Sequence, residues 1–167
     1  QDPFDDPDGT REEILAATYR ALYKHGYSDL TVQRIGDEFE QSTSLLYYHY
    51  ENKDELILEM LEFLLDAFEE RLTAGDITEP RDHLETFLEE MCDTATEQSH
   101  LEALLELRAR ATHEKQYQQH FNRSDRFFES YLSDVIRAGI EAGEFRDVDP
   151  DAVATTLITF LNGIVLY

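Results

Sequence analysis

The sequence is poor in several residue types that mark a protein's location. Its 167 residues include one cysteine, three lysines and no tryptophan. Cys92 has no second cysteine to pair with, so a disulfide within the chain is excluded and a reducing, cytoplasmic location is expected. The longest uncharged run, 152–167, has 16 residues, fewer than the ~20 that span a bilayer. We expect no membrane partner and interpret the run as a buried helix. The chain starts without Met and stops inside this helical pattern, which leaves open that both ends are trimmed.

Basic residues are also scarce: 14 Lys and Arg stand against 37 Asp and Glu, a formal net charge of −23. One interpretation is a halophilic protein, since at about 1 M salt the Debye length is about 3 Å and self-repulsion is screened. The alternative is an acidic surface that binds a basic partner or mimics nucleic acid. The acidic residues are spread over the whole chain, which favours the halophilic interpretation.

Strand-like alternation and internal repeats are absent, and apolar residues recur at helical spacing instead. Hydrophobic residues make up 41% of the chain, enough for a folded core. Residues 1–9, with four Asp and two Pro, are typical of a flexible acidic arm. A capping box at Thr10–Glu13 predicts the start of a first helix, and Gly26 predicts its end. The predicted fold class is all-α.

Cap residues predict the later helices. Each of the following precedes or begins an apolar helical pattern: Thr31, Ser42, Asn52, Pro80 and Asp149–Pro150. The two helices after Thr31 and Ser42 are short and adjacent, as in a helix-turn-helix unit that binds DNA in the major groove. We expect this unit at residues 10–53 and a second helical domain at residues 54–167.

Local motifs carry a resemblance to a known family. They are Ile14-Leu15-Ala16-Ala17, His25-Gly26-Tyr27, Leu30-Thr31-Val32, Leu46-Tyr47-Tyr48-His49-Tyr50 and Asn52-Lys53-Asp54-Glu55-Leu56. On these motifs residues 10–56 resemble the N-terminal domain of the TetR family of transcriptional regulators. The resemblance implies a three-helix DNA-binding domain followed by a helical bundle that binds an effector and dimerises.

The chain departs from the family pattern at two points. Phe39-Glu40-Gln41 stands where the family usually has a small residue, Gly and an apolar residue, so the turn lacks its glycine. Thr43 and Ser44 stand where a basic residue and Gly are common, so the helix that would read DNA has no Lys or Arg. These departures leave open an adaptor that keeps the fold without binding DNA.

The resemblance nevertheless assigns ten residues to a double-stranded DNA operator. Four can donate hydrogen bonds to phosphates: Thr31, Tyr47, His49 and Lys53. Four would face base edges: Thr43, Ser44, Leu45 and Tyr48. Gln33 and Arg34 would flank the groove, although Arg34 can instead pair with Asp37 or Glu38. Of the two adjacent tyrosines we expect one to pack inward. Residues 10–53 carry a net charge of only −2 against −17 for residues 54–167, which suits DNA binding.

The second domain contains two further sets of candidate residues. An effector pocket for a small apolar or aromatic molecule is expected among Met60, Phe63, Phe87, Met91, Leu104, Tyr117, Phe121 and Phe128. For each of these alone, ordinary core packing is the alternative. A homodimer interface is expected at Tyr131, Leu132, Val135, Ile136, Ile140, Val153, Leu157, Phe160, Leu161 and Ile164.

No catalytic, metal or cofactor site is predicted. His113 and His120 lie two helical turns apart, about 10 Å, which is too far for one metal ion, so we expect both to be solvated. Cys92 lies on an apolar face and is expected to be a small buried hydrophobe. The leading hypothesis is a ligand-responsive homodimeric regulator, a repressor, that binds a palindromic operator. An adaptor is the alternative, and an enzyme is the least favoured class.

Overall fold

The computed structural model describes residue 4 and residues 6–39, 42–96 and 98–164, with only the backbone described at 93–96, 98 and 164. These residues form eight helices and no strand, which confirms the all-α fold class. The helices are α1 (Thr10–Asp29), α2 (Val32–Asp37), α3 (Thr43–His49), α4 (Lys53–Thr73), α5 (Pro80–Thr96), α6 (Gln98–Arg110), α7 (Lys115–Glu141) and α8 (Pro150–Ile164).

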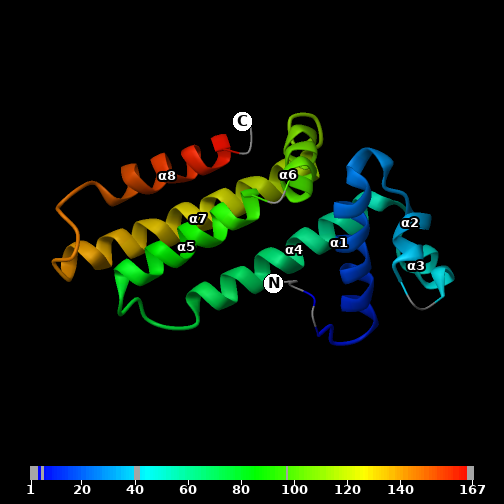
Figure 1. Ribbon diagram of the computed structural model, residues 1–167, viewed down its shortest axis with the longest axis horizontal. Helices are drawn as coiled ribbons and strands as arrows, with labels where there is room; N and C mark the ends of the chain where they lie inside the picture. Colours follow the sequence, from blue (N-terminus) through cyan, green and yellow to red (C-terminus); the bar gives the residue numbers. More distant parts are fainter. Residues whose placement is uncertain (1–3, 5, 40–41, 97, 165–167) are drawn as a thin grey trace.

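Helices α1 to α3 gather at one end of the molecule, and α4 runs from them towards α5, α7 and α8 (Figure 1). Helix α6 crosses between the two groups and packs on α1. Helix α7 packs on α8, α5 and α4. Helices α2 and α3 therefore lie apart from α5 and α8, and α4 and α6 join the two groups.

The start of α1 differs from the prediction. Gly9, with φ 87°, is the N-cap, and the capping box expected at Thr10 does not form because Thr10 is already helical. The Glu12 carboxylate accepts a hydrogen bond from the backbone N–H of Asp8 at 2.8 Å instead. At the other end Gly26, which was expected to end the helix, has φ 71° and breaks it with a kink, and the chain is helical again up to Asp29.

Two apolar cores hold the helices together. The first contains buried residues of α1 to α4 and also Ala103, Leu107, Tyr117 and Phe121 of α6 and α7, so it extends beyond residue 53. Phe4 belongs to it too, stacked on Phe63 at 5.3 Å between ring centroids. The expected flexible arm is therefore anchored at this residue. The second core lies between α5, α7 and α8.

The turn between α7 and α8 is tight. Gly143 has φ 74° and directly follows Ala142, the C-cap of α7. The ring of Phe145 packs directly on Gly139 of α7. A Cβ at this position would lie 2.1 Å from the ring, so the contact requires glycine. Asp149 then caps α8 by accepting hydrogen bonds from the N–H groups of Asp151 and Ala152. In the described part of the chain, no helix is both long and apolar enough to cross a membrane.

Candidate DNA interface and effector cavity

Close packing between α2 and α3 fixes the helix-turn-helix. Thr31 Oγ1 accepts a hydrogen bond from the Arg34 N–H at 3.1 Å and caps α2, as predicted. A Cβ on Gly36 would lie 2.5 Å from Cγ2 of Thr43, so glycine is required for this approach. Phe39 is buried at the end of α2. Gly36 thus allows α2 and α3 to approach closely, although the turn between them lacks the usual glycine. Glu40 and Gln41 of this turn lie outside the described residues.

The outer face of α3 presents aromatic side chains to solvent. Tyr47 is 58% exposed and Tyr48 is 83% exposed, so the expectation that one of them packs inward is wrong. His49 is exposed as well, and its ring lies edge-on to Tyr48 at 4.9 Å between centroids. Ser44 completes this exposed face. Hydroxyl and imidazole groups on one helix face are able to contact phosphates and base edges.

Two residues expected at base edges are partly used for packing. Thr43 is half-buried because its methyl group lies against Gly36. Leu45 is half-buried and packs on the first core. The family resemblance assigned both to the DNA side, but the short distance between α2 and α3 draws them towards the protein.

Thr31, Gln33 and Arg34 are all exposed at the start of α2. Gln33 Nε2 donates to Asp37 Oδ1 at 3.3 Å. The Arg34 guanidinium donates to the backbone carbonyl of Asp29 at 2.7 Å, so neither of the two ion pairs considered for it forms. This contact holds Arg34 beside the N-terminus of α2.

Lys53 has a structural position that the sequence did not predict. Its Nζ donates to the carbonyl oxygens of Tyr27 at 2.6 Å and Leu30 at 2.9 Å. It also lies 4.0 Å from the centroid of the Tyr27 ring. Burial lowers the pKa of the Lys53 ammonium. The ammonium expected on a phosphate therefore ties the end of α1 to the start of α4 in this structure.

Tyr27 is the meeting point of four helices. Its N–H donates to Glu106 Oε2 at 2.6 Å, and its hydroxyl donates to Asp54 Oδ1 at 2.9 Å. Tyr117 of α7 donates to the same Asp54 oxygen at 2.7 Å. The guanidinium of Arg110 lies 4.0 Å from the Tyr27 ring centroid. We call these five side chains and Lys53 the Tyr27 junction; it connects α1 and α4 with α6 and α7.

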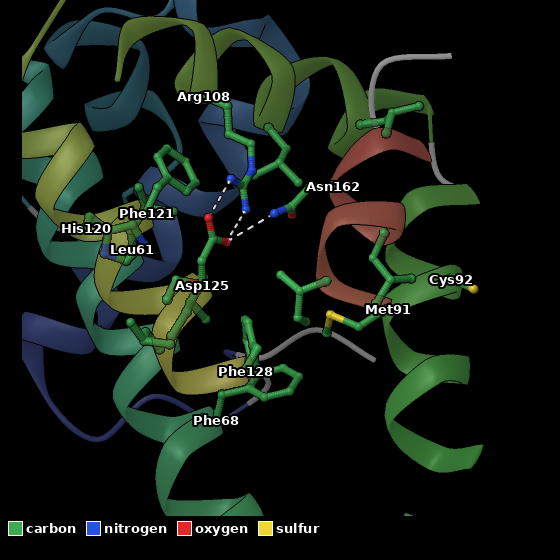
Figure 2. A pocket seen from close by; sticks show the side chains of 17 residues that line it. Leu61, Phe68, Met91, Cys92, Arg108, His120, Phe121, Asp125, Phe128 and Asn162 are labelled. Carbon is green, nitrogen blue, oxygen red and sulfur yellow. Dashed lines mark hydrogen bonds and ion pairs between the residues drawn. The ribbon is translucent and has the colours of Figure 1, made fainter. Parts of the chain in front are cut away.

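A cavity of about 250 Å³ lies between α4, α5, α6, α7 and α8. Most of its wall is apolar, with Phe68 and Phe128 at one end in edge-to-face contact at 5.7 Å (Figure 2). The volume is below the ~300–1,000 Å³ typical of drug-sized ligand sites, so it suits a small molecule.

The other end of the cavity is polar. Arg108 of α6 donates to Asp125 of α7 through NH2 at 3.0 Å and NH1 at 3.4 Å. Asn162 of α8 donates to Asp125 Oδ1 at 3.4 Å. Figure 2 shows the side chains of Arg108 and Asn162 pointing at the Asp125 carboxylate, so that three helices meet there. None of them was a sequence candidate, because residues 108, 125 and 162 share no motif.

Four of the eight predicted effector residues line this cavity: Met91, Leu104, Phe121 and Phe128. The other four do not. Met60 and Phe87 are fully buried in the first and second core, respectively. Phe63 packs against Phe4, and the Tyr117 hydroxyl is engaged by Asp54. Large apolar side chains on helices fill cores and line cavities alike, so the sequence does not separate the two roles.

Two residues that were expected to lie in a core or in solvent also line the cavity. His120 is buried, not solvated, and its Nδ1 lies 3.4 Å from Glu62 Oε1 of α4. Burial lowers the pKa of His120, partly opposed by Glu62. Cys92 is exposed, so the prediction of a buried hydrophobe is wrong. His113 is exposed, as predicted.

The predicted dimer residues divide into three groups. Tyr131, Leu132, Val135 and Ile136 are buried in this chain's own second core, because α7 packs on α5 and α8. Ile140, Val153, Leu157 and Leu161 are half-buried against that core. Phe160 is 66% exposed on the outer face of α8, beside the exposed Thr155, Thr156 and Thr159. The side chain of Ile164 lies outside the described residues.

Two family models match separate parts of the chain. Residues 14–60 match the family model of bacterial regulatory proteins of the tetR family, and residues 80–167 match the model of the BetI-type transcriptional repressor C-terminal domain. An HTH-type transcriptional regulator of Lactococcus lactis is 30% identical over 84 residues, which cover 50% of this chain and 42% of the relative. The probable acrEF/envCD operon repressor of Escherichia coli is 33% identical over 69 residues, 40% of this chain and 31% of the relative. The matched region thus spans less than half of each of these relatives.

Solved structures match over more of the chain. A TetR transcription regulator from Haloarcula marismortui is 37% identical with a TM-score of 0.81, over 93% of this chain and 84% of that one. A transcriptional regulator from Saccharomonospora viridis, solved in complex with choline, is 25% identical with a TM-score of 0.78, over 93% and 83%. The C-terminal model alone covers more than half of the sequence. The chain therefore belongs to the TetR family of bacterial regulatory proteins.

Proposed function

We propose that this chain is a transcriptional regulator that binds DNA as a homodimer and releases it when a small molecule enters the cavity. The observation that carries the DNA-binding part is the exposed face of α3. Tyr47 and Tyr48 leave most of their surface in water, although the tyrosines at 27, 117 and 131 are buried. Large aromatic side chains held outward on a rigid helix are suited to a macromolecular surface.

The charge distribution supports the same proposal. Residues 10–53 carry a net charge of −2, whereas residues 54–167 carry −17, so repulsion of phosphates is smallest at the DNA-binding unit. With no Lys or Arg on α3, affinity would depend mainly on hydrogen bonds and apolar contacts. Such contacts lose less affinity at high salt than ion pairs with phosphate do.

The cavity supports control by an effector. It is mostly apolar, small and reached by side chains of five helices. The complex of the Saccharomonospora viridis protein with choline shows that a protein of this fold holds a small molecule. We infer an effector with an apolar or aromatic body for the present chain.

The Tyr27 junction offers a route from the cavity to DNA. Arg108 lines the cavity, and Glu106 and Arg110, on the same helix, hold Tyr27 next to the kink at Gly26. A shift of α6 would therefore move the end of α1. Coupling of this kind is reciprocal: the effector weakens DNA binding by the free energy, typically ~1–3 kcal/mol, by which DNA weakens effector binding.

We propose that the outer face of α8, with Phe160 at its centre, forms the homodimer interface. Threonines surround Phe160 there, and none of the exposed residues at 152, 155, 156, 159 and 160 is charged. A two-fold axis through this face would present two α3 helices to one palindromic operator, with half-sites about 34–36 Å apart.

The test is selection of genomic DNA fragments by the purified protein in about 2 M KCl, where surface repulsion is screened. Enrichment of one short palindrome, together with a dimer by light scattering, is the expected result. A folded protein that enriches no sequence would favour the adaptor alternative, for which the lack of Lys and Arg on α3 is the observation. A monomer would contradict the interface on α8.

A further inference from the structure

One aromatic ring from outside the helices lies buried in the first core. Phe4 precedes α1, and only 5% of its surface is exposed. Its ring stacks on Phe63 of α4, with 5.3 Å between the centroids and 17° between the planes. It also lies 5.6 Å from the ring of Tyr19 on α1. A side chain of the N-terminal segment therefore contacts α1 and α4 at once.

The row of rings continues from Tyr19 to α6. The Tyr19 hydroxyl shares a hydrogen bond of 3.1 Å with Nε2 of His100 on α6. The ring of Tyr23, one turn further along α1, lies 4.4 Å from Tyr19 and 3.9 Å from His100 between centroids. We call Phe4, Tyr19, Tyr23, Phe63 and His100 the Phe4 cluster. It joins α1, which belongs to the DNA-binding unit, to α4 and α6.

The backbone before α1 directs Phe4 into this cluster. Gly9 has φ 87° and ψ 176°, a conformation that only glycine adopts without strain. The N–H of Asp8 donates to the Glu12 carboxylate at 2.8 Å and fixes the same turn. Tyr19 lies about 14 Å along α1 from the start of the helix, at ~1.5 Å per residue. Phe4 can contact it because the chain turns back along α1 at Gly9.

An ion pair between the same two helices is weaker in salt. Arg11 of α1 lies 2.5 Å from Glu59 of α4, but the Arg11 side chain is 60% exposed. Exposed ion pairs contribute little and are screened at high ionic strength, whereas buried apolar contacts are not. The Phe4 cluster therefore keeps its strength in concentrated salt, where this ion pair loses most of its own.

We propose that Phe4 is a positioning residue for DNA binding, which fixes the angle between α1 and α4. The DNA-binding unit meets the rest of the chain through α4 and α6 (Figure 1), so this angle sets the separation of the two α3 helices in the homodimer. A rigid joint holds them at one separation and favours one spacing of the operator half-sites. The inference rests on the proposed function, in which a homodimer binds a palindrome.

Four variants test this role. Phe4→Ala removes the ring, and Phe4→Leu keeps part of its apolar bulk. Gly9→Ala leaves the ring in place but strains the turn that directs it. Gly75→Ala is the matched control, since a Cβ there would meet no atom within 4 Å and its φ is not positive. Circular dichroism checks that each variant is folded; if Phe4→Ala does not fold, Gly9→Ala and Phe4→Leu decide.

The decisive readout is the preference for one half-site spacing. Each variant is titrated with the palindrome that the wild type selects and with versions that have one base pair added or removed at the centre. One base pair changes the half-site separation by about 3.4 Å and their relative rotation by about 35°. Titration in about 2 M KCl screens the carboxylates of residues 1–9, so their charge does not determine the result.

We expect the wild type and Gly75→Ala to bind the altered palindromes at least about tenfold more weakly than the selected one. In Phe4→Ala and Gly9→Ala the ratio should fall to about threefold or less, because a loose joint accommodates several separations, with Phe4→Leu between the two. A ratio that stays at the wild-type value, even with weaker binding at every spacing, would show a merely stabilising role and overturn the proposal.

Amide hydrogen exchange tests the joint without DNA. In Phe4→Ala we expect faster exchange in α1 near Tyr19 and in α6 near His100, with α8 unchanged. Exchange equal to that of the wild type would overturn the proposal. A wild type that selects no palindrome would refute the regulator itself, whereas a selected palindrome whose spacing preference survives in Phe4→Ala would refute the role of Phe4 alone.

Discussion

The backbone N–H of Tyr27 donates a 2.6 Å hydrogen bond to the carboxylate of Glu106, 79 residues further along the chain. Tyr27 directly follows the kink at Gly26, and Glu106 lies on α6, two residues before the cavity residue Arg108. This contact links the DNA-binding unit directly to the helix that carries the cavity's basic side chain.

Removal of this link should separate effector binding from DNA release. In Glu106→Gln the hydrogen bond loses its charge, and we expect a loss of stability of about 1–2 kcal/mol together with a weaker effect of the effector on DNA affinity. Chemical denaturation measures the first effect, and DNA titration with and without a small molecule that binds the cavity measures the second. Glu85→Gln, at an exposed site on α5, is the matched control. An unchanged effector response in Glu106→Gln would remove the Tyr27 junction from the coupling route.

Gly36→Ala should disrupt the DNA-binding unit. The new methyl group would lie 2.5 Å from Cγ2 of Thr43, and overpacking of this kind costs about 1–3 kcal/mol. We expect lower stability and weaker DNA binding. Thr43→Ser removes Cγ2, so the double variant should recover most of both losses. If the double variant is as impaired as Gly36→Ala, this contact does not set the distance between α2 and α3.

Lys53→Met should destabilise the fold even without DNA. The ammonium holds two backbone carbonyls at the end of α1, and hydrogen bonds to a charged group contribute about 1.5–3 kcal/mol each. We expect the free energy of unfolding to fall by about 2 kcal/mol. This is less than the sum of the two hydrogen bonds because the Lys53 side chain is partly exposed. Denaturation of Lys115→Met, at an exposed position on α7, provides the control. Equal stability of the two variants would leave Lys53 available for a phosphate.

His120 should make stability fall as the pH falls. Burial lowers its pKa, so the unfolded chain binds a proton more readily than the folded chain. Stability is then full above the unfolded pKa of about 6.5 and decreases below it until the folded pKa is reached. Among charged groups, Glu62 opposes this lowering of the pKa, and Arg123 and Arg108 add to it. The difference in unfolding free energy between wild type and His120→Asn, measured from about pH 7.5 to 5.5, isolates this residue from the many carboxylates. A difference that does not change with pH would contradict the assignment.

Three helix caps that follow local rules were predicted from the sequence. Thr31, Asn52 and Asp149 each cap a helix by accepting hydrogen bonds from N–H groups two or three residues ahead, so neighbouring residues contain the signal. The motif Tyr47-Tyr48-His49 lies on one short helix, as predicted, but both tyrosines are exposed although one was expected to pack inward.

Contacts between distant residues were not predicted. Arg108 and Asp125 belong to different helices, and the acceptors of Lys53 are backbone carbonyls, which every residue has. The apolar faces of α7 and α8 gave the same signal that a dimer interface would give, although Tyr131, Leu132, Val135 and Ile136 are covered within the chain. Amphipathic periodicity shows that a face is buried, but not which surface covers it.

The account's central claim is that the exposed face of α3 binds DNA. The most direct test compares the affinity of two matched variants, His49→Ala on α3 and His113→Ala between α6 and α7, for the palindrome that the wild type selects. Both histidines are exposed, so neither change should affect folding. We predict that His49→Ala weakens binding by about tenfold, the loss of one hydrogen bond at the interface, and that His113→Ala binds as the wild type does. Equal affinities of the two variants, both at the wild-type value, would contradict the claim.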